Sequence, residues 1–232
     1  MTIGIMGAMQ EEITPLLEYY KDYEIISFGG NTFYKVNLDS KTLIIARSRI
    51  GKVHSALTAA TMIMHFGAEK IIFNGVAGAV NDSYKIGDIV IASRLCQHDV
   101  DITIFGHPFG FFSESKIFVE SCKNLNALAL RVAEKIAKEN NIKVYKGTIA
   151  TGDQFISSNE KKAWIKKEFN ADAIEMEGSS VGVVCDNLEI PLCVIRSISD
   201  NASDEALISY EEFLESSAKI SAKLVIEMIE NL

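Results

Sequence analysis

The sequence has few prolines, few cysteines and no concentration of positive charge. Only 3 of its 232 residues are proline and no low-complexity tract occurs, which excludes a disordered or collagen-like chain. The formal net charge is −8 and lysine and arginine are not clustered, so no nucleic-acid or anionic membrane partner is expected. Because hydrophobic residues make up 48% of the chain, we expect a globular protein with a small-molecule ligand.

Long apolar runs and paired cysteine motifs are also missing. No run approaches the roughly 18 apolar residues of a membrane span, and the opening MTIGIMGAMQEE becomes acidic too early for a signal peptide. The four cysteines, Cys96, Cys122, Cys185 and Cys193, show no C-x-x-C spacing, and three lie in apolar or weakly polar runs that suit reduced thiols. We therefore expect a cytoplasmic protein.

Short apolar, β-branched runs alternate with longer segments of helical periodicity, which is typical of an α/β fold around a largely buried sheet. The length fits one domain over residues 1–232. A glycine turn at Phe28-Gly29-Gly30-Asn31 predicts an antiparallel hairpin, so the sheet should be mixed. The candidate strands are residues 2–7, 24–28, 32–38, 43–47, 70–74, 89–93, 144–151, 173–175 and 192–199.

Three segments place apolar residues three and four positions apart and predict amphipathic helices. Their apolar positions are Val53, Leu57, Ala60 and Met64; Leu125, Leu128, Val132 and Ile136; and Phe213, Ile220, Leu224 and Met228 with Ser217 between them. Ser209 and Glu212 form a capping-box pattern that predicts the start of the last helix. Residues 98–123 read as a long loop, and long loops in compact domains are often functional.

Acidic residues follow several predicted strands, where an open α/β sheet binds its ligands. Glu11 and Glu12 follow the first strand, Glu175 and Glu177 lie at the end of a short one, and Asp200 lies at the tip of the last. Gathered in one cleft, these carboxyl groups would raise one another's pKa, as an acid catalyst at neutral pH requires. The alternative is that they are separate caps, with Glu11 and Glu12 complementing a helix dipole.

Other chemistries have little support. Neither G-x-G-x-x-G nor G-x-x-x-x-G-K-[ST] occurs, so no dinucleotide or P-loop nucleotide site is expected. The run His98-Asp99-Val100-Asp101 has metal-ligating residue types without a zinc-like pattern. No G-x-S-x-G elbow accompanies His54 or His65, so we do not expect a Ser-His-Asp hydrolase. We expect neither a cofactor nor a metal.

Seven short motifs, each weak alone, together resemble the 5′-methylthioadenosine/S-adenosylhomocysteine nucleosidase family. They occur in the family's order from the first strand to the last helix: Gly7-Ala8-Met9-x-Glu11-Glu12, Gly51-Lys52-Val53, Asn74-x-x-Ala77-Gly78, Gly87-Asp88-Ile89-Val90, Gly152-Asp153-x-Phe155-Ile156, Glu175-Met176-Glu177 and Ser199-Asp200. The resemblance implies a nucleoside phosphorylase fold, a single α/β domain around a mixed, barrel-like sheet. It also implies a homodimer that takes adenine nucleosides as substrates.

The resemblance assigns the reaction to two carboxyl groups. Asp200 matches the general acid that protonates N7 of adenine, and Glu12 matches the base that activates water for attack at C1′. The implied transition state resembles an oxocarbenium ion, as in glycoside cleavage. Adenine would then leave as a neutral base.

The remaining matched residues would bind the nucleoside. Glu177 would accept hydrogen bonds from the ribose hydroxyls, and the backbone of Met176 would lie against the sugar. Glu175 would support that strand end, and Arg196 would hold Glu177 in position. Phe155 would stack on adenine, whose edge the backbone at Ile156 would read. The other matched positions around the sugar and the 5′ substituent are Met9, Ile50, Val76, Ala77, Gly78, Ser199 and Tyr210, together with Ile102 and Phe105, which would reach the partner subunit's site.

The chain departs from the family pattern around the sugar and the 5′ pocket. Val76 replaces a typical serine, His107 a frequent tyrosine, and Ser113 lies where proline is common. These changes bear on substrate range and leave Glu12 and Asp200 in place. Some bacterial members that resemble this chain also cleave 6-amino-6-deoxyfutalosine, and the sequence alone does not rank that nucleoside against methylthioadenosine or S-adenosylhomocysteine.

Two alternatives remain open from the sequence. A phosphorylase of the same fold would attack C1′ with phosphate and needs basic residues at that anion, for which Arg47 and Arg49 are candidates. Glu11 and Glu12 in the first turn favour water instead. A non-catalytic nucleoside-binding protein would be expected to lose Glu12 or Asp200, and both are present.

Overall fold

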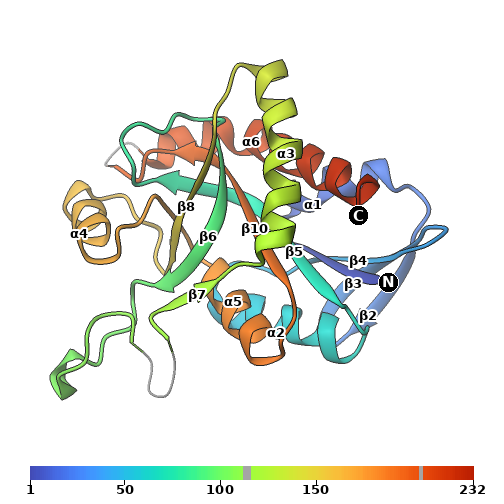
Figure 1. Cartoon of the computed structure of the whole chain (residues 1–232), viewed down its shortest axis with the longest axis horizontal. Coiled ribbons are helices and arrows are strands. Elements are labelled where there is room, and N and C mark those ends of the chain that lie inside the picture. Colours follow the sequence, from blue (N-terminus) through green and yellow to red (C-terminus); the bar gives the residue numbers. More distant parts are fainter. Residues whose placement is uncertain (112–115, 204–205) are drawn as a thin grey trace.

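A single mixed sheet organises the chain in the computed structural model, which describes residues 1–111, 116–203 and 206–232 (Figure 1). Strands β10, β6, β8, β9 and β5 follow one another in the sheet, and β10 also pairs with β5, so these five close into a barrel. Strands β1, β4, β3 and β2 continue the sheet beyond β5. The fold expectation of an α/β domain with a mixed, barrel-like sheet is confirmed.

The elements have the following bounds. The strands are β1 (Thr2–Gly7), β2 (Glu24–Phe28), β3 (Asn31–Asn37), β4 (Thr42–Arg47), β5 (Lys70–Ala79), β6 (Ile89–Gln97), β7 (Phe118–Glu120), β8 (Val144–Thr151), β9 (Ala173–Glu175) and β10 (Leu192–Asp200). The helices are α1 (Gln10–Tyr19), α2 (Lys52–Met64), the 3-10 turn η1 (Thr103–Phe105), α3 (Lys123–Asn140), α4 (Asn159–Phe169), α5 (Gly178–Asn187) and α6 (Ala206–Glu230).

Helices cover both faces of the sheet, which explains its continuous apolar runs (Figure 1). In β4, Leu43 and Ile45 belong to the core cluster shared with α1, α3 and α6, whereas Ile44 and Ala46 belong to the cluster shared with α2 and α5. Successive side chains of a strand point to opposite faces, so the same run supplies two cores. None of the described helices is long and apolar enough to cross a membrane.

Several boundaries differ from the sequence expectations. β5 does not end at Asn74 but continues to Ala79, because its small residues remain hydrogen-bonded to β10 and β9. β6 continues to Gln97 beside β8, and Phe118–Glu120 within the expected loop forms β7 against β6. Ser113 lies outside the described residues. These strands are extended by pairing with strands distant in the sequence, which the apolar periodicity within a segment cannot predict.

Two helices correct the sequence interpretation. α6 begins by Ala206, so Ser209 lies inside the helix and does not cap it. The upstream Ala-Leu-Ile run is compatible with helix, which allows the helix to extend past a local capping pattern. The second predicted helix, now α3, does bury Leu125, Leu128, Val132 and Ile136 as expected.

The expected apolar face of α2 is not its buried face. Ser55, Thr58, Ala59 and Met62 are buried, whereas Val53, Leu57 and Met64 are exposed. The small residues let α2 approach α5 closely, and the hydroxyls of Ser55 and Ser180 lie 2.7 Å apart across that contact. Val53, Leu57 and Met64 therefore point outward, and Met62 is a large apolar residue of this helix that faces the core.

Candidate functional site

A pocket of about 320 Å³ lies where the ends of β1, β9 and β10 meet the second half of β5. Its volume is within the ordinary range for small-molecule sites. Its wall consists largely of apolar and small residues, together with four carboxyl groups, those of Glu12, Glu175, Glu177 and Asp200. The lining residues are Ala8, Met9, Glu12, Ile50, Val76, Ala77, Gly78, Gln154, Phe155, Ile156, Ile174, Glu175, Met176, Glu177, Ser199, Asp200, Ala202, Leu207 and Tyr210.

Most of the sequence-predicted site residues lie in this pocket. The structure brings together Met9, Glu12, Ile50, Val76, Ala77, Gly78, Phe155, Ile156, Glu175, Met176, Glu177, Ser199, Asp200 and Tyr210. Arg196, Ile102 and Phe105 do not line it. Sequence reasoning did not name Ala8, Gln154, Ile174, Ala202 and Leu207 as site residues. Ala8 and Gln154 lie within predicted motifs, Ile174 adjoins Glu175, and Ala202 lies two residues after Asp200, but nothing local to Leu207 signals its place.

Glu12 is held in the first turn of α1 by backbone amides. One carboxylate oxygen accepts from the amides of Ala8 and Met9, and the other accepts from the amide of Val76 at 3.0 Å. The side chain is almost fully buried. Burial raises the pKa of this carboxyl above its usual value, although the charge of Arg196 and these backbone hydrogen bonds oppose the rise.

Glycines of β1 and β5 make room for Glu12. A Cβ at Gly75 would lie 2.6 Å from the Glu12 Oε1 atom, and a Cβ at Gly7 would lie 2.8 Å from the Glu12 Cβ. No real Cβ makes contacts that short without displacement. Glycine is therefore needed at these positions because the strand backbone lies too close to Glu12 to leave room for a side chain.

Asp200 occupies the end of β10 on the same pocket. Its carboxylate accepts from the Ala202 amide at 2.8 Å and from the Ser199 hydroxyl at 2.9 Å. Burial raises the pKa of Asp200, and these two hydrogen bonds, followed by the charge of Lys162, act in the opposite direction. Asp200 therefore has the tendency to hold a proton that a general acid needs.

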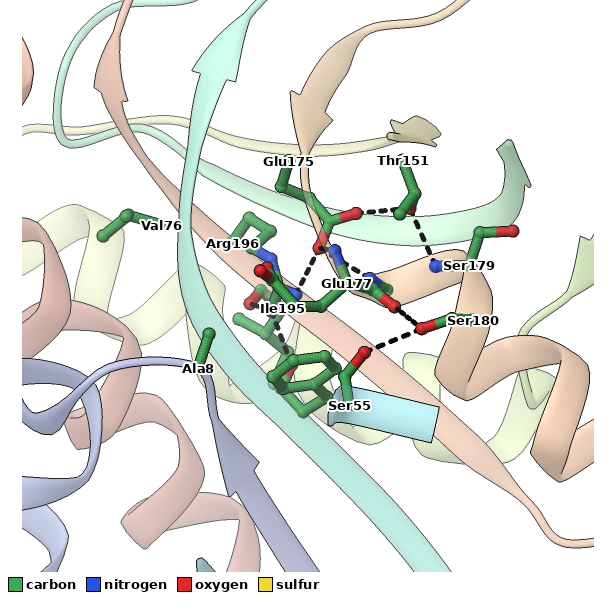
Figure 2. Close-up of polar contacts among 12 residues, drawn as sticks. Ala8, Ser55, Val76, Thr151, Glu175, Glu177, Ser179, Ser180, Ile195 and Arg196 are labelled. Carbon is green, nitrogen blue, oxygen red and sulfur yellow. Dashed lines mark hydrogen bonds and ion pairs between the residues drawn. The ribbon is translucent and has the colours of Figure 1, made fainter. Parts of the chain in front are cut away.

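Glu175 is the centre of a buried polar network. Figure 2 shows its carboxylate between the Thr151 hydroxyl, which donates to it, and the guanidinium of Arg196, whose Nη2 lies 2.6 Å away. The amide of Gly178 donates to the same carboxylate at 2.7 Å. These contacts satisfy Glu175 within the protein.

Arg196 supports Glu175 and not, as the sequence predicts, Glu177. Its guanidinium forms the buried ion pair with Glu175, donates to the Phe73 carbonyl at 3.2 Å and lies over the Phe73 ring. The two glutamates lie on either side of Met176: Glu175 ends β9, whereas Glu177 directly precedes α5. They are only two positions apart, and local sequence does not specify which of them pairs with Arg196.

Glu177 is oriented differently and its carboxylate faces the pocket. Within the described part of the chain it accepts one hydrogen bond, from the amide of Gly51 at 2.8 Å. Burial, and next the charge of Glu175, raise the pKa of Glu177 to about 8. A buried carboxylate with spare acceptor capacity is suited to a ligand that presents hydroxyl groups.

Aromatic and thioether groups close one side of the pocket. The ring of Phe155 packs edge-on against Tyr210 at 5.5 Å between centroids and remains partly exposed. The Tyr210 hydroxyl lies 2.8 Å from the Met9 sulfur. This wall offers a flat apolar surface to a heteroaromatic ring.

Ile102 and Phe105 do not line the pocket: Ile102 directly precedes η1 and Phe105 ends it, on a loop that projects from the body of the molecule (Figure 1). Phe105 is 76% exposed. No lysine or arginine is among the residues that line the pocket, and the described residues contain no cluster of three or more metal-ligating side chains. The Arg49 guanidinium instead donates to the Gly30 carbonyl.

Comparison with known proteins gives concordant results. The family model described as the phosphorylase superfamily matches residues 2–230. An aminodeoxyfutalosine nucleosidase of Helicobacter pylori is 51% identical over 231 residues, which cover 99% of each chain. A 5′-methylthioadenosine/S-adenosylhomocysteine nucleosidase of Staphylococcus haemolyticus is 36% identical, with coverage of 99% of this chain and 100% of that protein.

Solved structures agree with the sequence relatives. A mutant Helicobacter pylori methylthioadenosine nucleosidase with 5′-methylthioadenosine in its active site has a TM-score of 0.94 and 50% identity to this chain. The alignment covers 100% of this chain and 99% of that one. The same fold in that protein therefore accommodates an adenine nucleoside.

Proposed function

The chain belongs to the phosphorylase superfamily, and from that premise we propose that it hydrolyses the N-glycosidic bond of 5′-substituted adenine nucleosides. The observation that carries this proposal is the pocket itself. Two buried carboxyl groups with raised pKa values, Glu12 and Asp200, line one cavity together with the hydroxyl-binding candidate Glu177. That combination suits acid-assisted cleavage of a bond between a sugar and a base.

Asp200 is the proposed general acid. Protonation of N7 makes adenine a neutral leaving group, and electron density from the ring oxygen of the ribose stabilises the cationic C1′ as the bond to the base lengthens. The bond from C1′ to the base nitrogen breaks with its electron pair going to adenine. Burial of Asp200 favours the protonated form that this step requires.

Glu12 is the proposed base. A water between Glu12 and C1′ would give one proton to the carboxylate while its oxygen bonds to the sugar carbon. The three backbone amides that hold Glu12 fix its orientation, so the carboxylate need not reorganise during the reaction. Glu177 would accept from the ribose hydroxyls, and Phe155 would lie against adenine.

The nucleophile is proposed to be water and not phosphate. A phosphorylase would need cationic groups converging on the anion, whereas the residues that line this pocket include acids and no lysine or arginine. A dianionic phosphate beside Glu12 would face a buried carboxylate without a counter-charge. Relatives named as nucleosidases support the same choice.

The substrate range is proposed to include 5′-methylthioadenosine, S-adenosylhomocysteine and 6-amino-6-deoxyfutalosine. A relative at 51% identity is named for the last of these, and one at 36% for the first two. Val76, which lines the pocket beside Glu12, and His107, which is exposed on the projecting loop, are the positions that we expect to influence the preference.

Adenine release by the purified protein tests the reaction. Each of the three nucleosides is supplied in phosphate-free buffer and again with phosphate, and the sugar product is identified. Free sugar at a rate independent of phosphate is the expected result. A strict requirement for phosphate with a sugar 1-phosphate as product would refute the hydrolytic mechanism, and no adenine release from any of them would refute the function.

We also propose that two copies pair to form the working enzyme. Ile50, Val53, Leu57 and Met64 form an exposed apolar surface on and before α2, which we call the α2 face. Val53 and Met64 are 76% and 77% exposed, and an apolar surface of this kind is usually covered by a partner. In such a pair, Ile102 and Phe105 of one copy would complete the 5′ side of the other copy's pocket.

A cytoplasmic location is proposed on the basis of the thiols. All four cysteines are free, and Cys96, Cys185 and Cys193 are buried. Burial raises the pKa of Cys96 and of Cys185 to about 12, so both remain neutral core residues. Such thiols require no oxidising compartment, and cell fractionation with an antibody would test the location.

A further inference from the structure

The run His98-Asp99-Val100-Asp101 has a structural role that its residue types alone do not suggest. The Asp99 carboxylate accepts from the Lys52 ammonium at 2.7 Å and from the Asp153 amide at 2.9 Å. The Asp153 carboxylate accepts in turn from the Lys52 amide at 2.8 Å. Three residues from different parts of the sequence thus form a closed set of contacts through their side chains and two backbone amides. We call this set the Lys52–Asp99–Asp153 link.

The link joins two segments that each contribute to the pocket, since Ile50 lines it from one segment and Phe155 from the other. Lys52 is the first residue of α2, and the preceding Gly51 donates its amide to Glu177. Asp153 directly precedes Gln154 and Phe155, which line the pocket. Lys52, Asp99 and Asp153 do not themselves line it. The link therefore connects the residue that binds Glu177 with the wall offered to the base, without occupying the site.

Glycine at position 51 makes this connection possible. Its φ of 100° is in a region that side chains rarely adopt, and its position brings the amide to Glu177. The Asp153 carboxylate occupies the N-terminus of α2, where unpaired amides need an acceptor. The direction of the Gly51 amide thus depends on where Asp153 lies.

Burial and packing keep the link in one arrangement. The side chains of Lys52 and Asp99 are 17% and 14% exposed, so their ion pair is largely shielded from water. The imidazole of His98 packs beneath the turn, only 2.4 Å from where a Cβ at Gly152 would lie. Asp99 accepts from the Asp153 amide and His98 packs against Gly152, so the Gly152–Asp153 backbone is restrained at both residues. These contacts restrict where the Asp153 carboxylate can lie.

We propose that Asp99 and Lys52 are positioning residues of the enzyme, which set the Gly51 amide against Glu177 and hold Phe155 opposite it. They act through neighbouring backbone and touch no reacting atom. This inference rests on the proposed nucleosidase function. Loss of the link should weaken nucleoside binding, while proton transfer by Glu12 and Asp200 continues once the nucleoside is bound.

The test compares Lys52→Met, Asp99→Ala and the double variant with the wild type, using adenine release from 5′-methylthioadenosine. We expect KM to rise by about 10- to 100-fold, the scale of a misplacement of about 1 Å in a site, while kcat changes much less. The double variant should be no worse than the single ones, because residues of one network are not additive. Lys52→Arg, which keeps the charge and donor, should recover part of the loss.

Lys223→Met is the matched control, since it also removes a lysine from an ion pair, with Glu139 at 2.8 Å between α3 and α6. It should leave KM unchanged. If Asp99→Ala does not fold, Asp99→Asn replaces it, because the NH2 group that takes the place of one carboxylate oxygen cannot accept a hydrogen bond, and the contact with either Lys52 or the Asp153 amide is lost. Melting temperature and oligomeric state are measured for every variant.

The outcomes separate this inference from the function on which it rests. A wild-type protein that releases no adenine would refute the function. An active wild type whose Lys52→Met and Asp99→Ala or Asp99→Asn variants keep a normal KM would overturn the positioning role. A decrease in kcat alone would also overturn the positioning role. So would a loss of activity that follows a lower melting temperature or dissociation of the oligomer while KM stays unchanged.

Discussion

Three buried glutamates in one pocket differ in what satisfies their carboxyl groups, and that difference separates their roles. Glu12 accepts from three backbone amides, Glu175 from a hydroxyl, two amides and a guanidinium, and Glu177 from one amide. Glu175 is thus a structural centre, whereas Glu177 keeps acceptor capacity for a ligand. Identical residue types two positions apart have different functions because their surroundings differ.

Asp200→Asn should lower the rate of the chemical step by about 10²- to 10⁴-fold, the usual contribution of a general acid. The amide keeps the size of the carboxyl group but has no proton to deliver to N7. Single-turnover adenine release measures the effect, and nucleoside affinity measured by calorimetry should change little. Near-normal turnover would mean that another group protonates the base.

Glu177→Gln should change how stability depends on pH. The pKa of Glu177 is about 8 in the folded protein against 4.5 for an ordinary glutamate, so the folded state binds more protons between those values. Stability therefore falls as pH rises from about 4.5 to 8. The amide does not titrate, so the variant should lose less stability than the wild type across that interval.

Thermal melting at pH 5 and pH 8 provides the measurement for Glu177→Gln. Glu168→Gln, an exposed position on α4, is the matched control and should follow the wild type. An unchanged pH dependence in Glu177→Gln would show that the Glu177 carboxyl titrates close to its ordinary range.

At the scale of elements, β5 shows how a strand can be both scaffold and site. Its first half is an apolar core strand, and its second half consists of small residues that approach Glu12 and Asp200. A Cβ at Gly78 would lie 2.7 Å from the Asp200 Oδ1 atom, as one at Gly75 would lie close to Glu12. The glycines of this one strand therefore determine how closely the carboxyl groups of Glu12 and Asp200 approach the barrel wall.

Gly75→Ala should impair both activity and stability. The methyl group would displace the Glu12 carboxylate or the backbone that bonds it, and overpacking of a buried site commonly costs about 1–3 kcal/mol. We expect kcat to fall by at least about tenfold, by analogy with other small displacements of catalytic groups. Denaturant unfolding and steady-state kinetics measure the two effects.

A matched position tests whether Gly75→Ala acts through Glu12. Gly67→Ala introduces the same methyl group where nothing lies within 4 Å, at a φ of 70° that also disfavours alanine. It should reduce stability without affecting kcat. Equal kinetic effects of both variants would contradict a specific contact between position 75 and Glu12.

The expected and observed elements agree where the residues that end an element are adjacent to it in the sequence, and differ where distant partners decide its bounds. β1, β2, β8 and β9 have the expected bounds because turns or changes of periodicity end them locally. The extension of β5, the existence of β7 and the start of α6 depend on partners distant in sequence. The helical spacing also did not identify α4 or α5; α5 contains two glycines and several β-branched residues, which are weak helix formers.

At the scale of the whole molecule, closure of the barrel assembles the site. The β10–β5 pairing places Asp200 opposite Gly78, while β1 lies on the other side of β5 and leads to Glu12. Residues 12, 177 and 200 meet at one pocket only because the sheet returns on itself. The pocket is therefore a property of topology and not of any one motif.

Leu57→Glu should dissociate the proposed dimer, because it places a charge in the middle of the α2 face. We expect a monomer by analytical ultracentrifugation and a raised KM, since Ile102 and Phe105 of the second copy would no longer cover the 5′ pocket. Ile25→Glu, an equally exposed apolar position on β2, is the control and should change neither. A wild type that is monomeric at working concentration would refute the dimer.

The sequence by itself determined the class of fold, the order of its elements and the motifs that carry the chemistry, because periodicity, turns and residue types are local properties. Only the tertiary structure decided that Arg196 pairs with Glu175, that Val53, Leu57 and Met64 of α2 face outward, and that Asp99 joins Lys52 to Asp153. Each of these depends on which side chains meet after distant strands pair. A one-residue shift or a helix rotation changes such contacts while leaving the local pattern of the sequence unaltered.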